Sequence, residues 1–188
     1  MTRVHRPHLL GIDDGPFEKG APEVAIVGVV TEGQDLVEGV AVTRFPADGG
    51  DVTTFLADWI LGLRFQPALQ GIVLGGITIA GLAIVDIAAL AERTKTPVLA
   101  VSRRDPKDHR LAGALRAARF ADRQAIVDRT PPAFALTDNV FVACAGTSAE
   151  HGAALVRASC SKADLPEPLR LAHLIARALM TGQSRGRV

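Results

Sequence analysis

The chain has 188 residues, a formal net charge of +1 at pH 7, and 48% apolar against 22% charged residues. This apolar share excludes a disordered chain, and the length suits one α/β domain, which we expect to span residues 1–188. A charge so close to zero argues against a broad basic surface that coats nucleic acid, although it allows a local basic patch. No apolar run reaches the roughly 20 residues that cross a bilayer, so we expect no membrane partner.

Cysteine and aromatic content narrow the function classes further. The two cysteines, Cys144 and Cys160, form no CxxC motif, which argues against a structural zinc site. So few cysteines, and first residues without a signal-peptide pattern, predict a cytoplasmic protein. The chain has one Trp and no Tyr, which disfavours a general single-strand-binding protein that stacks bases on aromatic rings.

Three strands are predicted at the start of the chain. HLLGID (8–13) is short and apolar, and PEVAIVGVV (22–30) is the nearly continuous apolar run of a strand covered on both faces. LVEGVAVTRF (36–45) alternates apolar and polar residues, and the turn residues before it predict a hairpin. Because no helix separates the three strands, we expect an antiparallel meander.

Helices and strands alternate after Asp51. This aspartate suits the N-cap of a helix whose apolar residues recur at helical spacing up to Leu63. GIVLGG (71–76) predicts a buried strand, GLAIVDIAALAER (81–93) a helix, and TPVLAVS (96–102) another buried strand. This order predicts parallel pairing, and hence a mixed sheet flanked by helices.

The last third of the chain predicts further helices at 107–119, 122–129 and 148–158, with a hairpin at 134–143. The final helix is the clearest, because Pro168 suits its first turn. Its shared apolar face consists of Leu171, Leu174, Ile175, Ala178 and Leu179.

Two adjacent acids, Asp13 and Asp14, stand where the first strand ends before Gly-Pro. Neighbouring strand residues point to opposite faces, so both acids can face one site only if the strand ends there. An aspartate in this position also simply starts a turn. The alternative is a divalent cation site in which Asp13 binds the metal and Asp14 supports it, since hard cations prefer carboxylate oxygens.

Other candidate residues each have an ordinary structural explanation. Asp51 is a helix cap, and Asp86 is a solvated acid within the predicted helix 81–93. The GGIT stretch (75–78) ends a predicted parallel strand, where α/β proteins usually place their sites, but it lacks phosphate-loop or dinucleotide spacing. The final helix carries a basic stripe that is either a solvated face or a phosphate contact. The stripe consists of Arg170, His173 and Arg177, followed by Arg185 and Arg187.

Five stretches resemble the endonuclease dU family: GIDDGPF, DVTTFLADWI, LGGITIAGLAIVDI, TPVLAVSRRDP and PEPLRLAHLIARALMTGQSRGR. The resemblance covers nearly the whole chain in the family's order, and its first and last motifs are the most specific. The family is similar to endonuclease V and is placed among the RNase H-like nucleases. The resemblance implies a mixed five-stranded core sheet with strands 1 to 3 antiparallel and strands 4 and 5 parallel to strand 1, plus a C-terminal hairpin and helices.

The resemblance also implies an activity and its residues. The activity is Mg²⁺- or Mn²⁺-dependent cleavage of DNA near deoxyuridine, with Asp13 and Asp51 as metal ligands and Asp14 as a further catalytic acid. Carboxylates that share a cation are expected within about 4–6 Å of each other. Contacts with DNA are expected from Phe17, Gly76, Thr78, Arg170, Arg177 and Arg185.

One position departs from the family. Where the family has LDGIT, this chain has VLGGIT, so Gly75 replaces the third acid. The lost ligand is expected to weaken metal binding and cleavage unless Asp14 or Asp86 compensates. A DNA-repair endonuclease is therefore weighed against a related protein that binds nucleic acid without cutting it. A small-molecule-binding protein is a third alternative, with no cofactor motif behind it.

Overall fold

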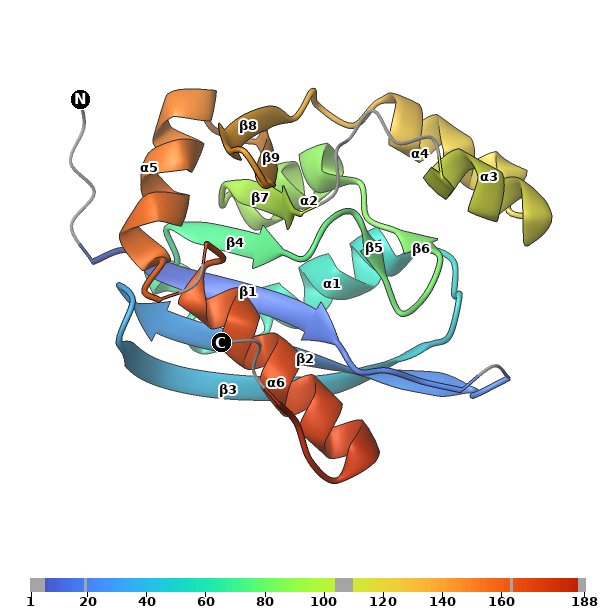
Figure 1. The fold of residues 1–188 in the computed structure, drawn as a ribbon, viewed down its shortest axis with the longest axis horizontal. Helices are drawn as coiled ribbons and strands as arrows, with labels where there is room; N and C mark the ends of the chain where they lie inside the picture. Colours follow the sequence, from blue (N-terminus) through green and yellow to red (C-terminus); the bar gives the residue numbers. More distant parts are fainter. Residues whose placement is uncertain (1–5, 19, 104–109, 163, 186–188) are drawn as a thin grey trace.

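Seven strands form the central sheet: β1 (His8–Asp14), β2 (Glu23–Glu32), β3 (Leu36–Pro46), β4 (Gly71–Leu74), β7 (Val98–Ser102), β8 (Phe134–Thr137) and β9 (Val140–Ala145). Their spatial order is β3-β2-β1-β4-β7-β9-β8 in the computed structural model (Figure 1). The structure describes residues 6–18, 20–103, 110–162 and 164–185.

Strand directions follow the sequence pattern. β1, β2 and β3 are antiparallel neighbours, which confirms the predicted meander. β4 is parallel to β1, and β7 is parallel to β4, as the alternation of strands and helices predicts. β9 pairs antiparallel with β7, so the predicted C-terminal hairpin extends the same sheet. The sheet therefore has seven strands, five of them in the expected core arrangement.

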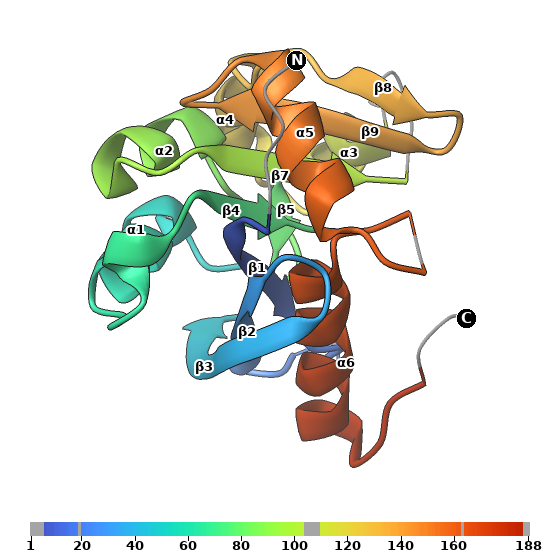
Figure 2. The same cartoon turned by 90° about the vertical axis from the view of Figure 1, so that its left-hand side faces the viewer.

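Helices cover both faces of the sheet (Figure 2). On one face, α1 (Val52–Leu61) and α2 (Ile87–Thr94) pack into the largest apolar cluster. On the other face lie α5 (Ala149–Ser159) and α6 (Glu167–Thr181). Coverage on both sides explains why all four residues of β4 are buried and apolar.

The buried face of α6 differs from the predicted one. Leu169, Ala172 and Ala176 are the buried apolar residues on this helix, whereas Leu179 is 54% exposed. α6 runs so close to β1 that a Cβ on Gly11 would collide with the main chain at the start of the helix. Small residues are therefore needed where α6 contacts β1, and the larger apolar residues of the predicted face lie beside this contact.

The predicted helix at 81–93 is wrong in its first half. A short hairpin, β5 (Thr78–Ile79) and β6 (Ala83–Ile84), precedes α2. Short apolar runs fit a strand as well as a helix, and here tertiary burial decides, because both β6 residues are buried.

Asp86 is consequently not inside a helix. It is the N-cap of α2, and its Oδ1 accepts hydrogen bonds from the main-chain N–H groups of Ala88 at 3.1 Å and Ala89 at 3.0 Å. Its other oxygen, Oδ2, forms an ion pair with Arg129 at 2.7 Å. These contacts fully explain the residue as a cap.

The described residues 110–128, between β7 and β8, contain two short helices and a 3₁₀ turn. They are α3 (Arg110–Ala117), the 3₁₀ turn η2 (Ala121–Arg123) and α4 (Gln124–Asp128), called the helical arm below. The predicted residues 107–109 of its first helix lie outside the described residues. Another 3₁₀ turn, η1 (Gln66–Ala68), precedes β4. Within the part of the chain that the structure describes, no helix is long and apolar enough to cross a membrane.

Candidate functional site

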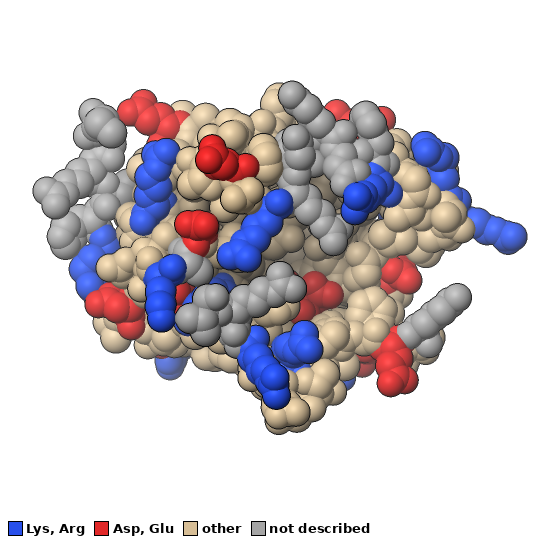
Figure 3. All heavy atoms as spheres, in the orientation of Figure 1, with Lys and Arg blue, Asp and Glu red and all other residues tan. Residues whose placement is uncertain are grey.

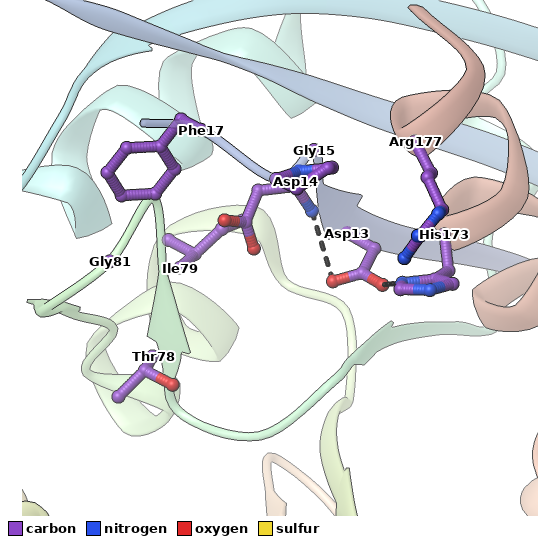
Figure 4. A pocket seen from close by; sticks show the side chains of 10 residues that line it. Asp13, Asp14, Gly15, Phe17, Thr78, Ile79, Gly81, His173 and Arg177 are labelled. Atoms are coloured by element: carbon purple, nitrogen blue, oxygen red, sulfur yellow. Dashed lines mark hydrogen bonds and ion pairs between the residues drawn. The ribbon is translucent and has the colours of Figure 1, made fainter. Parts of the chain in front are cut away.

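An open pocket of about 450 Å³ lies where β1 ends, between α6 and the β5–β6 hairpin (Figure 4). Its lining consists of Asp13, Asp14, Gly15, Pro16, Phe17, Thr78, Ile79, Gly81, His173 and Arg177. Figure 3 shows acidic side chains recessed in a hollow of this face, with basic side chains over α6 beside them. The pocket thus joins segments from three distant parts of the chain.

Asp13 is held from two sides. Its Oδ1 accepts a hydrogen bond from the Asp14 N–H at 3.0 Å, and its Oδ2 lies 2.8 Å from Nδ1 of His173 on α6. The hydrogen bond to Asp13 raises the pKa of His173 above its usual value. The carboxylate is therefore fixed in orientation, and its charge is balanced whenever His173 is protonated.

Asp14 has a different environment. Burial, followed by the charge of Asp13, raises the pKa of Asp14 to about 7. A main-chain hydrogen bond from Ala80 partly opposes this rise. Near neutral pH, Asp14 therefore exists in both its charged and its neutral form, as is typical of acids in functional sites.

Both acids line one pocket because β1 ends with them. Asp13 faces α6, and Asp14 faces the opposite side of the sheet, as alternation requires. β1 ends at Asp14, and both carboxyl groups line the pocket at this end of the sheet (Figure 4). The prediction that the doublet marks the end of the first strand is confirmed.

The remaining wall is largely apolar. Phe17 and Ile79 contribute apolar side chains, and Thr78 adds a hydroxyl group. Gly81 has φ +93°, and a Cβ there would lie 2.9 Å from the ring of Phe17 and would collide with the carboxylate of Asp48. Glycine is thus required for the hairpin to approach this closely.

The structure brings together some of the predicted residues and leaves others apart. Asp13, Asp14, Phe17, Thr78 and Arg177 all line the pocket. The other predicted residues lie outside its lining: Asp51, Gly76, Asp86, Arg170 and Arg185.

Arg170 and Arg177 differ although they share the predicted stripe. The guanidinium of Arg170 binds both carboxylate oxygens of Glu167, with contacts of 2.7 to 3.0 Å. Arg177 lines the pocket and has no ion pair with any residue within the described ranges. Among the described arginines of the stripe, Arg177 is therefore the one whose charge is available at the pocket, and Arg187 lies outside the described residues.

Asp51 does not act as a side-chain cap. It precedes α1 in a left-handed conformation with φ 53°, and its carboxylate forms no capping hydrogen bond. Its main-chain carbonyl starts the helix by accepting from the Phe55 N–H at 3.2 Å. α1 packs on the face of the sheet opposite α6, whereas Asp13 points toward α6. The structure therefore gives no support to a cation shared by Asp13 and Asp51.

Gly75 stands directly beside Asp13. A Cβ at this glycine would lie 3.5 Å from Oδ1 of Asp13, an ordinary van der Waals distance. Gly75 is also absent from the residues with positive φ, so its backbone accepts other side chains. The position where the resemblance implies a third acid thus adjoins the first acid, with room for a side chain.

Sequence reasoning missed two features of the pocket. The contact of His173 with Asp13 joins residues 160 positions apart, which no local pattern reveals. Gly81 was missed because it was assigned to the start of the predicted helix 81–93, and Ile79 because it lay between that helix and the GGIT stretch. A signal for the latter exists: a glycine in the middle of a short apolar run favours a turn between strands.

The donor set fits one hard cation better than two. Asp13 and Asp14 line the same pocket, and Mg²⁺ is commonly bound by one or two carboxylates together with water and substrate phosphate. Among residues 6–18, 20–103, 110–162 and 164–185, no group of three or more His, Cys, Asp or Glu side chains is arranged to hold a metal ion. A pair of cations needs more carboxylates than the described pocket offers.

Comparison with known proteins gives close relatives over most of the chain. The Endonuclease dU family model matches residues 5–180. A UPF0215 protein of Methanothermobacter thermautotrophicus is 36% identical over 184 residues, which cover 95% of this chain and 90% of the relative. A UPF0215 protein of Thermococcus gammatolerans is 38% identical over 194 residues, which cover 98% of both chains.

Solved structures agree with this relationship. A crystal structure of an Archaeoglobus fulgidus protein superposes with a TM-score of 0.85 at 33% identity, covering 93% of this chain and 98% of that one. The catalytic domain of human endonuclease V shares the fold, with a TM-score of 0.62 at 16% identity over 94% of this chain and 83% of that one. Ciona intestinalis endonuclease V, solved with an inosine-containing DNA, has a TM-score of 0.60 at 16% identity, covering 94% of this chain and 87% of that one. The fold is therefore RNase H-like, and the chain belongs to the Endonuclease dU family.

Proposed function

We propose that this protein is a metal-dependent DNA endonuclease that acts on deaminated, deoxyuridine-type lesions in DNA repair. The observation that carries the proposal is the position of Asp13 and Asp14 at the end of β1, in a pocket of a chain from the Endonuclease dU family. The likeness to Ciona endonuclease V, which was solved with an inosine-containing DNA, supports DNA as the partner. The pocket also suits an extruded base, because apolar and polar groups face each other across it.

Each side chain has a defined part in this proposal. Asp13 and Asp14 hold Mg²⁺ or Mn²⁺, which when bound polarises the phosphate and makes water more acidic. Arg177 pairs with a DNA phosphate at the rim of the pocket. Phe17 contacts the face of the lesion base, and Thr78 offers it a hydroxyl group.

The test is direct incubation of the protein with DNA. Duplexes that contain uridine, inosine or an abasic site, and an undamaged control, are mixed with protein and Mn²⁺ or with EDTA. We expect cleavage of the uridine-containing duplex that EDTA abolishes. Equal cleavage of all four duplexes would contradict the lesion specificity, and cleavage that persists in EDTA would contradict the metal dependence.

A second function is favoured by Gly75 in particular. The glycine removes an expected ligand next to Asp13, whose carboxylate is already bound by His173 and by the Asp14 N–H. In this second candidate function, the protein binds deaminated DNA without cutting it. Preferential binding of the uridine-containing duplex, with no product even at high protein concentration, identifies this function.

A further inference from the structure

The tip of the β5–β6 hairpin, residues 80–82, is tied to Asp48 by two hydrogen bonds. The Asp48 N–H donates to the Ala80 carbonyl at 2.8 Å, and the Leu82 N–H donates to Oδ1 of Asp48 at 2.7 Å. Gly81, which lines the pocket, lies between these two contacts. Asp48 therefore fixes the part of the hairpin that forms the pocket wall.

Arg123 of the helical arm holds the same point from outside. Its Nη1 donates to the Leu82 carbonyl and its Nη2 donates to the Asp48 carbonyl, each at 2.7 Å. The guanidinium also stacks on Phe120, 3.9 Å from the ring centroid. The planar fork of an arginine suits two acceptors at once, so this one side chain joins the arm, the loop after β3 and the hairpin.

Ala80 links this contact to the acids of the pocket. Its φ of 49° is left-handed, which is uncommon for a residue with a Cβ and persists only where the surroundings enforce it. Its carbonyl accepts from the Asp48 N–H at 2.8 Å, and its main chain lies near enough to Asp14 to lower the pKa of that carboxyl group. The conformation enforced at Ala80 thus sets the position of Gly81 beside Asp14.

The anchoring is local, because the arm has little contact with the sheet. Leu115 is its only fully buried residue within residues 110–128. Besides Arg123, the ion pair of Arg129 with Asp86 joins the end of this segment to the body at 2.7 Å. That second tether contacts the cap of α2 and leaves the hairpin tip untouched.

We propose that Arg123 is a positioning residue: acting through Asp48 and Leu82, it holds the hairpin tip in the shape that completes the lesion pocket. The proposal rests on the proposed function only for the nature of the ligand. The structural part, that Arg123 holds the wall carrying Gly81, stands on the contacts alone.

Hydrogen exchange tests the structural part without any substrate. Arg123→Met removes both carbonyl contacts and retains an apolar side chain of similar length. We expect the amides of Asp48 and Leu82, which donate the two hydrogen bonds at the hairpin tip, to exchange about tenfold faster in this variant, because local opening becomes easier. The matched control is Arg129→Met, which cuts the other tether and is expected to leave these amides unchanged. Unchanged exchange in Arg123→Met, or equal acceleration in both variants, would overturn the proposal.

Kinetics with uridine-containing DNA test the positioning part. In Arg123→Met we expect KM to rise about tenfold with a smaller change in kcat, because the wall serves binding rather than bond cleavage. The ratio of kcat/KM for uridine-containing DNA to that for undamaged DNA should also decrease. Arg123→Lys, whose ammonium reaches one carbonyl, is expected to restore part of the loss. Faster exchange with an unchanged KM would show a merely structural role and reject the positioning part. If the wild type neither binds nor cuts the DNA, the proposed function fails, while the exchange result still decides whether Arg123 holds the hairpin.

Discussion

The two sides of the pocket differ in chemistry and in the way the chain builds them. The β1–α6 side is charged, because Asp13, His173 and Arg177 line it and Asp13 contacts His173. The hairpin side is mainly apolar and is shaped by Gly81. The first side rests on long, well-packed elements, whereas the second rests on a hairpin of two-residue strands. In the proposed function, this contrast assigns the chemistry to the charged side and the choice of base to the hairpin side.

The largest expected effect comes from Asp13 on the charged side. We expect Asp13→Asn to reduce cleavage of uridine-containing DNA by about 100-fold or more, because the cation loses a charged ligand. The measurement is the initial rate with Mn²⁺. Asp58→Asn is the matched control, since Asp58 pairs with Arg93 outside the pocket. Equal losses in both variants would show that the pocket is not the catalytic site.

A second prediction distinguishes Asp14 from Asp13 by how each substitution changes the free energy of unfolding. The folded-state pKa of Asp14 is raised to about 7 from a usual 3.8, so the folded protein binds more protons than the unfolded chain between these values. Stability is therefore lost as the pH rises from about 4 to about 7. Asp14→Asn removes the buried charge and is expected to stabilise the protein at pH 8 by on the order of 2 kcal/mol.

Urea unfolding in EDTA at pH 4.5 and pH 8 measures this difference. The stabilisation by Asp14→Asn should almost vanish at pH 4.5, where the carboxyl group of Asp14 in the wild type is mostly neutral. Asp13→Asn provides the comparison on the same strand, and it should show a smaller gain, because the loss of the contact with His173 offsets the relief of the repulsion on Asp14. A gain of Asp14→Asn that is equal at both pH values would show that charge is not its cause.

The charged side could be predicted from sequence more fully than the hairpin side. Asp13 and Asp14 were recognised because an apolar strand ends abruptly at Gly-Pro, and Arg177 because α6 has a strong helical pattern. The β5–β6 hairpin was not predicted, because the apolar run LAIV (82–85) fits the spacing of a helix as well as that of a strand. Only the burial of this run beside α1 selects the strand. Register and long-range pairing, such as Asp13 with His173, depend on how elements pack and have no local signature.

The strands themselves illustrate the same limit. β1, β2, β4 and β7 were found because each contains a continuous apolar run, which reflects cover on both faces. The buried face of α6 was found only in part. Leu171 and Ile175 pack against the buried cluster, but Gly11 and the two alanines of the helix permit a close approach that hydropathy alone does not indicate.

A third prediction concerns Gly75, which stands beside Asp13 on the charged side. Gly75→Asp should place a carboxylate near Oδ1 of Asp13 and tighten Mn²⁺ binding about tenfold, with a corresponding rise in cleavage. Isothermal titration with Mn²⁺ measures the affinity. Gly75→Asn is the control, since it has the same shape without the charge. If the wild type already cuts rapidly and Gly75→Asp adds nothing, the idea of an impaired enzyme is wrong and another residue supplies the ligand.

The smallest expected effect distinguishes two arginines of one helix. Arg177→Gln should weaken DNA binding severalfold and reduce the salt slope of the affinity by about one, because one phosphate contact is lost. Arg170→Gln should leave binding unchanged, since Glu167 already holds that guanidinium, and should instead lower the Tm by leaving the buried Glu167 without its partner. Fluorescence anisotropy at several salt concentrations, with thermal unfolding of both variants, separates the two outcomes. If Arg170→Gln weakens binding as much as Arg177→Gln does, the whole stripe contacts DNA, and the contact extends along α6 beyond the pocket.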